Sequence, residues 1–140
     1  MMPDLRRVSG ASIGKRRKRV QICDTCGVMH ERNPPQCYCG AMVFTKFDSK
    51  GEAQRWAQLR MFEKAGEISR LKRQVAFPLA ADGGTTVGKY VADFEYRDAA
   101  GKLVVEDYKG GAITGLAEWK RRHFEAQHGF AVTIVTKRTK

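Results

Sequence analysis

The chain has few acidic residues and no long apolar run. Its 140 residues carry 15 Asp and Glu against 26 Lys and Arg, which gives a formal net charge of +11. The apolar stretches are far shorter than the roughly 18 residues that a membrane-spanning helix requires. The basic N-terminus lacks the apolar segment that a secretory signal needs. These absences argue against a membrane protein and a secreted protein, so we expect a cytoplasmic location.

Cysteine is also scarce, and all four cysteines fall within one short segment: Cys23, Cys26, Cys37 and Cys39. A glycine follows each pair, which lets the backbone turn its amide groups towards the sulfurs. Four thiolates at this spacing predict a closed, structural Zn²⁺ site. Disulfides are the alternative, but nothing in the chain indicates secretion. His30 is a further candidate ligand, although a loop histidine is more often solvated.

The excess positive charge gathers in clusters along the chain. Such clustering is typical of proteins that bind the phosphates of nucleic acid. The predicted DNA-binding residues lie in an N-terminal arm and in a later helix: Arg16, Arg17, Lys18 and Arg19, then Lys120, Arg121 and Arg122. A solvated surface, or a tail for ribosomal RNA or acidic lipid, is the alternative. No amphipathic lipid-binding stripe accompanies the arm.

The residue pattern predicts an α/β protein in three parts, with a flexible basic arm at 1–20, a zinc knuckle at 21–46 and a core at 47–140. The core begins with a helix at 48–65, which a capping-box signature starts and a glycine ends. The later elements are extended runs at 75–79, 90–97 and 103–109, a helix at 114–128 and a strand at 130–136. A turn at 98–101 joins two of the runs as a hairpin. The order predicts a mixed central sheet flanked by helices.

Two of the extended runs carry acids where a buried sheet should not. Side-chain alternation places Asp93 on one face of its strand, and it places Asp107 and Lys109 together at the end of an apolar strand. If the hairpin pairs these strands, Asp93 lies next to Asp107. Two facing carboxylates need a cation between them, and hard oxygen ligands suit Mg²⁺ or Mn²⁺. A surface salt bridge to Lys109 is the alternative.

Other residues have two interpretations each. Glu52 begins an apolar stripe of the first helix and offers a third acid, or it simply completes the capping box. Gln74 assists in positioning a water, or is a plain surface residue, which is the simpler interpretation. Lys120 reaches towards a substrate backbone, or extends to solvent. Three aromatic residues are expected in the core and not as base-stacking platforms: Trp56, Trp119 and Phe124.

An acid on the first helix, an acid on a strand and acid-x-lysine on the next strand resemble the PD-(D/E)xK nuclease superfamily. More closely, residues 47–135 are similar to small bacteriophage proteins described as endonuclease-like or Holliday-junction-resolvase-like. The matching segments are Phe47-Asp-Ser-Lys-Gly-Glu-Ala, Glu63-Lys-Ala-Gly-Glu-Ile, Tyr90-Val-Ala-Asp-Phe-Glu-Tyr and Val104-Val-Glu-Asp-Tyr-Lys-Gly. The P in the name of the superfamily stands for a proline directly before the first aspartate. In this chain Ala92 occupies that position, which varies among members of the superfamily.

The resemblance implies a restriction-endonuclease-like core and a metal-dependent DNA endonuclease of phage DNA metabolism, acting in the host cytoplasm. It assigns Glu52, Asp93 and Asp107 to a catalytic Mg²⁺ or Mn²⁺, with Lys109 completing the site. It also implies a preference for branched DNA. A homodimer is expected, because symmetric cutting of a junction requires paired sites. The alternatives are a zinc-containing nucleic-acid-binding protein without catalysis, and an RNA-directed or nicking nuclease.

Overall fold

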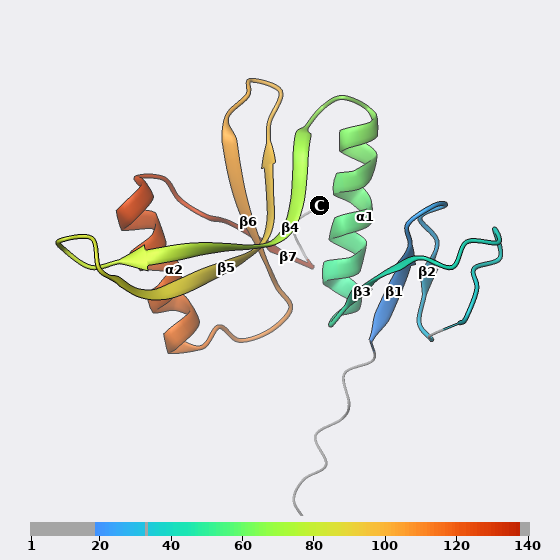
Figure 1. The fold of residues 1–140 in the computed structure, drawn as a ribbon, viewed down its shortest axis with the longest axis horizontal. Coiled ribbons are helices and arrows are strands. Elements are labelled where there is room, and N and C mark those ends of the chain that lie inside the picture. The colour runs from blue at the N-terminus through green and yellow to red at the C-terminus, as the bar shows by residue number, and fades with distance from the viewer. Residues whose placement is uncertain (1–18, 33, 138–140) are drawn as a thin grey trace, which may run out of the picture.

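The cysteine-rich segment forms a small sheet of its own. The computed structural model describes residues 19–32 and 34–137, so most of the predicted basic arm lies outside the described residues. β1 (Val20–Cys23) pairs antiparallel with β2 (Met29–His30) on one side and with β3 (Phe44–Phe47) on the other. All four residues of β1 are buried. Because successive side chains point to opposite faces of a strand, both faces of the sheet are covered along β1. The sheet packs against the helix that follows it (Figure 1).

That helix, α1 (Lys50–Lys64), starts where the capping signature predicts. The Ser49 hydroxyl oxygen accepts the backbone N–H of Glu52 at 3.1 Å, so one half of the capping box forms. Gly66 follows the helix end with a left-handed backbone, φ 77°, as a helix stop requires. The predicted helix at 48–65 is confirmed.

The second sheet has four strands in the order β4-β5-β6-β7. β4 (Ser69–Ala80), β5 (Thr86–Arg97) and β6 (Leu103–Lys109) are antiparallel, and β7 (Thr133–Thr136) is parallel to β6 after the crossover through α2 (Gly115–His128). The predicted order of elements and the mixed α/β class are confirmed. β5 is longer than predicted because its first residues pair with the end of β4 beside the 81–85 loop, and β7 is shorter. β4 begins earlier than predicted, because Ser69, Lys72 and Arg73 pair with Arg97, Glu95 and Phe94. No helix in the described part of the chain is long and apolar enough to cross a membrane.

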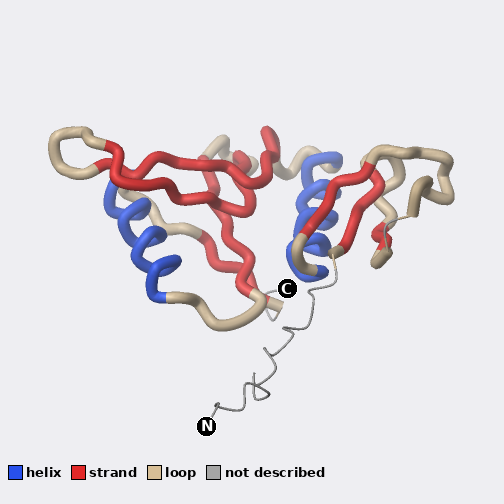
Figure 2. Tube along the Cα trace, turned by 60° about the horizontal axis from the view of Figure 1, so that its bottom comes forward, coloured by secondary structure: helices blue, strands red, loops and turns tan. Residues whose placement is uncertain are grey.

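Two hydrophobic cores lie on either side of the middle of β5, and each is covered by one helix (Figures 1 and 2). The core at α1 includes Phe94 and Tyr96 of β5, together with residues of the small sheet. The core at α2 includes Tyr90 and Ala92. β5 therefore passes from one core to the other at Asp93, the residue between these pairs.

The three predicted core aromatics do not all lie in these cores. Trp56 and Phe124 are buried, as expected. The expectation for Trp119 is wrong, since 53% of its surface is exposed. It lies at the edge of α2 beside the β4–β5 loop, where its ring meets that of the half-buried His123 edge-on. One helix face is enough to cover the sheet, so the other stays in solvent.

Candidate functional site

The four cysteines converge on one point in the small sheet. Cys23 Sγ and Cys39 Sγ are 3.7 Å apart, Cys26 Sγ and Cys37 Sγ are 3.5 Å apart, and all four sulfurs lie within 4.8 Å of one another. Zn–S bonds of about 2.3 Å in a tetrahedron would separate the sulfurs by about 3.8 Å, which these distances match. A disulfide requires a separation of about 2.05 Å, and all four cysteines are free. The cluster fits a metal ion such as zinc.

Backbone turns and a histidine support this cluster. The Gly27 and Gly40 N–H groups donate to the carbonyls of Cys23 and Cys37 at 2.9 Å each, and both glycines have left-handed backbones. The backbone N–H of Cys26 lowers the pKa of Cys23 to about 6. Backbone N–H groups also act on Cys37 and Cys39, but burial and the neighbouring sulfurs outweigh them and raise the pKa values of both, so Cys23 is the thiol that favours the thiolate. His30 Nε2 lies 3.3 Å from Cys37 Sγ. His30 therefore contacts a ligand sulfur, in the outer position that commonly orients metal ligands.

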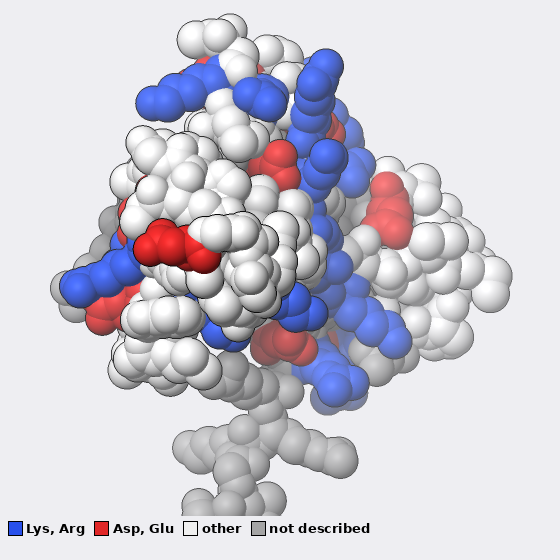
Figure 3. All heavy atoms as spheres, turned by 60° about the vertical axis from the view of Figure 1, so that its left-hand side comes forward, with Lys and Arg blue, Asp and Glu red and all other residues white. Residues whose placement is uncertain are grey.

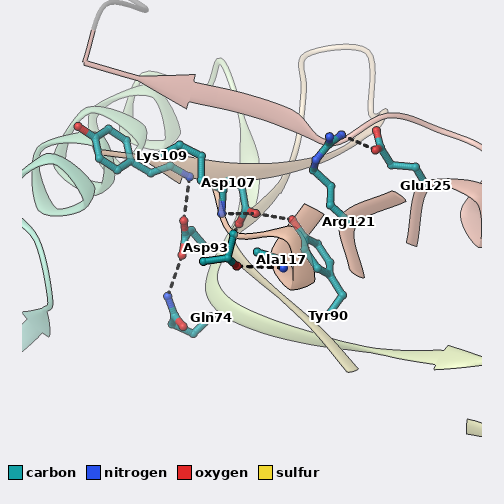
Figure 4. A network of polar contacts seen from close by, with 10 residues as sticks. Gln74, Tyr90, Asp93, Asp107, Lys109, Ala117, Arg121 and Glu125 are labelled. Carbon is teal, nitrogen blue, oxygen red and sulfur yellow. Dashed lines mark hydrogen bonds and ion pairs between the residues drawn. The ribbon is translucent and has the colours of Figure 1, made fainter. Parts of the chain in front are cut away.

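The acidic candidates lie where β5 and β6 separate. The paired residues of the two strands run from Arg97 and Leu103 to Phe94 and Glu106, and the pairing ends there. Beyond that point the Asp93 N–H donates to Asp107 Oδ1 at 3.2 Å, and the Tyr108 N–H donates to Asp93 Oδ2 at 2.8 Å (Figure 4). Where the backbone pairing has ended, each carboxylate thus accepts an N–H of the other strand in place of a backbone carbonyl. The structure brings Asp93 and Asp107 together.

Asp107 is only 3% exposed and has two further contacts. Its Oδ2 accepts the Tyr90 hydroxyl at 2.6 Å and lies 3.2 Å from Lys109 Nζ. Burial raises the pKa of Tyr90, so the hydroxyl stays protonated and donates. The Asp107–Lys109 ion pair exists, but it holds a buried carboxylate and is not the weak surface pair of the alternative interpretation.

Glu52 reaches this group through Gln74. The Gln74 side-chain N–H₂ donates to Glu52 Oε1 and to Asp93 Oδ1, at 3.2 Å in each case. Gln74 lies in β4 opposite Asp93 of β5. The residues on either side of it, Arg73 and Val75, pair with Phe94 and Ala92, which flank Asp93. Its φ is 51°, a left-handed conformation that costs a non-glycine residue about 1–2 kcal/mol. Arg70 of the same strand has a similar φ of 55°, so what distinguishes Gln74 is that its exposed side chain contacts both Glu52 and Asp93.

The pKa values of Glu52 and Asp93 are both raised, chiefly by burial. Burial raises the pKa of Asp93; the Tyr108 N–H opposes this, and the charge of Asp107 adds to it. Burial also raises the pKa of Glu52, and the charge of Asp93 adds to it. A cation would relieve both, and carboxylate oxygens suit a hard divalent ion. In the part of the chain that is described, however, only the cysteines bring three or more ligand atoms within reach of one point.

Two contacts that the sequence did not point to hold α1 at this position. Glu106 is fully buried on the opposite face of β6 from Asp107, as the alternation predicts. Its Oε2 accepts Arg55 of α1 and the Tyr96 hydroxyl, at 2.9 Å each. At Gly51, an added Cβ would lie 2.0 Å from the Tyr108 hydroxyl oxygen. Only glycine allows the start of α1, and so Glu52, to approach β6 this closely.

The predicted DNA-binding residues fall into three groups. Arg16, Arg17 and Lys18 lie outside the described residues. Arg121 and Arg122 form ion pairs with acids of their own helix, Glu118 and Glu125, so the geometry gives their predicted phosphate contacts no support. Arg19 and Lys120 line pockets beside the acidic site.

Three cations that line the same pockets were missed, because each is isolated in the sequence: Lys46, Arg73 and Lys89. Folding gathers them where the sequence does not. Figure 3 shows Lys and Arg side chains in a band between two paler lobes of the molecule.

A family model described as "Protein of unknown function (DUF1064)" matches residues 41–140 of the chain. The match includes every candidate acid and Lys109, but it begins after Cys39 and so leaves out the four cysteines. Neither the curated proteins nor the solved structures contain a match to the chain.

Proposed function

Because the chain belongs to the DUF1064 family of proteins of unknown function, we propose its activity from the site itself: metal-dependent hydrolysis of phosphodiester bonds within DNA. One observation carries the proposal. Asp93 and Asp107 occupy the fork between β5 and β6, each held by an N–H of the other strand, with Lys109 Nζ 3.2 Å from Asp107. Placing two carboxylates and an ammonium at a break in a sheet weakens the fold, so a chemical role is the better explanation.

The reaction requires a nucleophilic water, relief of negative charge at phosphorus, and a proton for the leaving oxygen. A divalent ion such as Mg²⁺ or Mn²⁺, held by Glu52, Asp93 and Asp107, would polarise the phosphoryl oxygen and acidify a bound water. Lys109 provides a point charge for the oxygen on which negative charge develops. A bond forms between the water oxygen and phosphorus as the bond from phosphorus to the sugar oxygen breaks. The water releases one proton to solvent, and the sugar oxygen takes up one proton from solvent.

Gln74 and Tyr90 act on the ligands in this proposal. The Gln74 amide holds Glu52 and Asp93 at one distance from a shared nitrogen. The Tyr90 hydroxyl fixes Asp107 Oδ2 on the side away from Asp93. Both residues keep the carboxylates oriented before a substrate arrives, which is how a preorganised site lowers a reaction barrier.

The arrangement α1-β4-β5-β6-α2-β7, with β7 parallel to β6, supports a restriction-endonuclease-like core. Zinc in the cysteine cluster has a structural part here, since four cysteines leave it no open position. Selectivity for branched DNA, a homodimer and a role in phage DNA metabolism rest on the sequence resemblance and stay predictions.

The test is cleavage by the purified protein of a four-way junction, duplex DNA, single-stranded DNA and RNA, with and without added Mg²⁺ or Mn²⁺. We expect DNA cleavage that depends on the added ion and is lost in Lys109→Met. Lys102→Met, an exposed lysine of the β5–β6 turn, is the matched control. If the protein binds DNA but cuts none of the substrates with either ion, the result would support the non-catalytic alternative and contradict the proposal. Cutting of RNA alone would reassign the substrate.

A further inference from the structure

Two surface pockets lie beside the acidic site. The first, of about 220 Å³, has Arg19, Lys46 and Arg73 in its lining; we call it the α1 pocket. The second, of about 300 Å³, has Lys89, Lys109 and Lys120 in its lining; we call it the α2 pocket. Each pocket therefore presents three cations.

The carboxylates stand between the two pockets. Glu52 and Gln74 line the α1 pocket, and Asp107 lines the α2 pocket. Asp93 joins the two sides, because it accepts the Gln74 amide and donates its N–H to Asp107. A chain that crossed the site from one pocket to the other would pass over Asp93 and Asp107.

Most of the pocket cations have no carboxylate partner among the described residues, a property that they share with other surface cations such as Lys64 and Lys102. Arg55, Arg121 and Arg122 form ion pairs with carboxylates. In residues 19–32 and 34–137, four pocket cations form none: Lys46, Arg73, Lys89 and Lys120. The acids that share these pockets are Asp48 and Glu52 on the α1 side and Asp107 on the α2 side.

Arg73 adds a second observation on the α1 side. Its guanidinium lies over the Phe47 ring at 4.5 Å and donates once, to the Lys46 carbonyl at 3.0 Å. Its Nε is buried and has no hydrogen-bond partner among the described residues. Arg121 Nε is in the same state, and a buried Nε cannot itself reach a phosphate. A phosphate would meet the terminal N–H groups of the Arg73 guanidinium.

We propose that the α1 and α2 pockets are two phosphate-binding subsites, which hold one nucleic-acid strand on both sides of the bond that is cut. Lys46 and Arg73 bind the strand on one side, and Lys89 and Lys120 bind it on the other. The inference rests on the proposed function and adds to it: a strand held on both sides is cut internally, and a free end is not required.

Equilibrium binding of a labelled single-stranded oligonucleotide tests the subsites without cleavage. The Asp93→Asn protein is used in buffer without added divalent ions, so that cutting cannot affect the result. Three double variants are compared: Lys46→Gln with Arg73→Gln, Lys89→Gln with Lys120→Gln, and the control Lys64→Gln with Lys102→Gln. The control residues are exposed and lie outside both pockets, and all three doubles lose the same charge.

We expect each pocket double to weaken binding about tenfold, and to reduce the slope of log affinity against log salt by about 1.4, because each phosphate contact on single strands contributes about 0.7. The control should bind as its parent does. Lys46→Gln alone, at an exposed residue, repeats the α1 measurement without disturbing the packing of Arg73 on Phe47. If either pocket double binds as the control does, that pocket is not a subsite and the proposal is overturned.

The second arm uses the parent protein with Mg²⁺ on closed single-stranded circles and on linear strands of the same sequence. Cutting of circles and linear strands at similar rates supports internal cleavage. Cutting of linear strands alone overturns the internal path but leaves hydrolysis intact. Failure of the parent to cut anything counts against the proposed function, and the binding measurements still decide whether the pockets hold phosphate.

Discussion

The molecule has two sites with opposite construction. The cysteine site takes all its ligands from one segment, Cys23–Cys39, and its four sulfurs already lie within bonding reach of one ion. The acidic site takes its residues from α1, β4, β5 and β6, and its carboxylates are linked only through Gln74 and backbone N–H groups. A site within one segment, such as the cysteine site, is complete once the turns of that segment form. A site assembled from four elements depends on how the whole core packs.

The largest expected effect is on cleavage, and it should distinguish the acidic site, which controls cleavage, from the cysteine site, which controls stability. Asp107→Asn keeps an acceptor for the Asp93 N–H but removes the charge. We expect cleavage to fall about 10³-fold, the size of loss when one preorganised electrostatic group is removed, in a protein that keeps the metal of its cysteine site but unfolds at a lower midpoint, because the buried ion pair with Lys109 is lost. Asp82→Asn, in the exposed β4–β5 loop, is the control. Unaltered cleavage in Asp107→Asn would remove Asp107 from the active site.

Cys26→Ser should instead act on the cysteine site. Because the binding energy of a structural zinc is part of the folding energy, we expect less than one zinc per chain and a loss of about 3 kcal/mol or more in the free energy of unfolding. Thr25→Ser, on the same turn, should change neither. A Cys26→Ser protein with full stability and no zinc would show that the cluster is not a structural centre.

What could be predicted from the sequence follows the same division. The cysteine site, the helix at 48–65 and the run 103–109 were predictable, because each depends on local spacing, capping or alternation. The adjacency of Asp93 and Asp107 followed from the hairpin. Gln74 was a candidate for positioning a water, but its contacts with Glu52 and Asp93 could not be predicted, since they join residues of three separate elements. Nor could the contacts of Gly51 and Arg55, which meet residues more than fifty positions away.

A pair of variants at Gln74 sharpens the comparison at a smaller scale. Glycine adopts the left-handed backbone of this position without strain and alanine does not, while both lack the amide. We expect Gln74→Gly to be more stable than Gln74→Ala by about 1 kcal/mol, as measured by chemical denaturation. Cleavage should fall about tenfold or more in both, because positioning of Glu52 and Asp93 is lost. Full cleavage in both variants would limit Gln74 to a structural part.

The smallest effect should appear in stability against pH. The pKa of Asp93 is raised above its ordinary value of 3.8, chiefly by burial. As the pH rises from that value, the unfolded chain releases this proton before the folded chain does, so the contribution of Asp93 makes stability fall with rising pH. Asp93→Asn should therefore be more stable than its parent at neutral pH, and the gain should vanish in acid below pH 3.8.

Mg²⁺ provides the complementary measurement at neutral pH. An ion that binds only the folded state raises its stability, so Mg²⁺ should raise the unfolding midpoint of the parent. The same addition should have little effect on Asp93→Asn. Equal shifts in the two proteins would place the ion somewhere other than between Glu52 and Asp93.

The small sheet and α1 share one core, in which Val20, Ile22 and Phe47 meet Trp56. Any reagent that removed a metal ion from the cysteine cluster would therefore loosen the support of the helix that carries Glu52. Under the proposed function, a chelator would abolish activity by two routes that differ in reversibility. Loss of Mg²⁺ from the acidic site would be reversed at once by adding Mg²⁺. Unfolding of the cysteine-rich segment after loss of Zn²⁺ would be reversed only by adding Zn²⁺ and allowing time to refold. The order in which the two ions are added back distinguishes these routes.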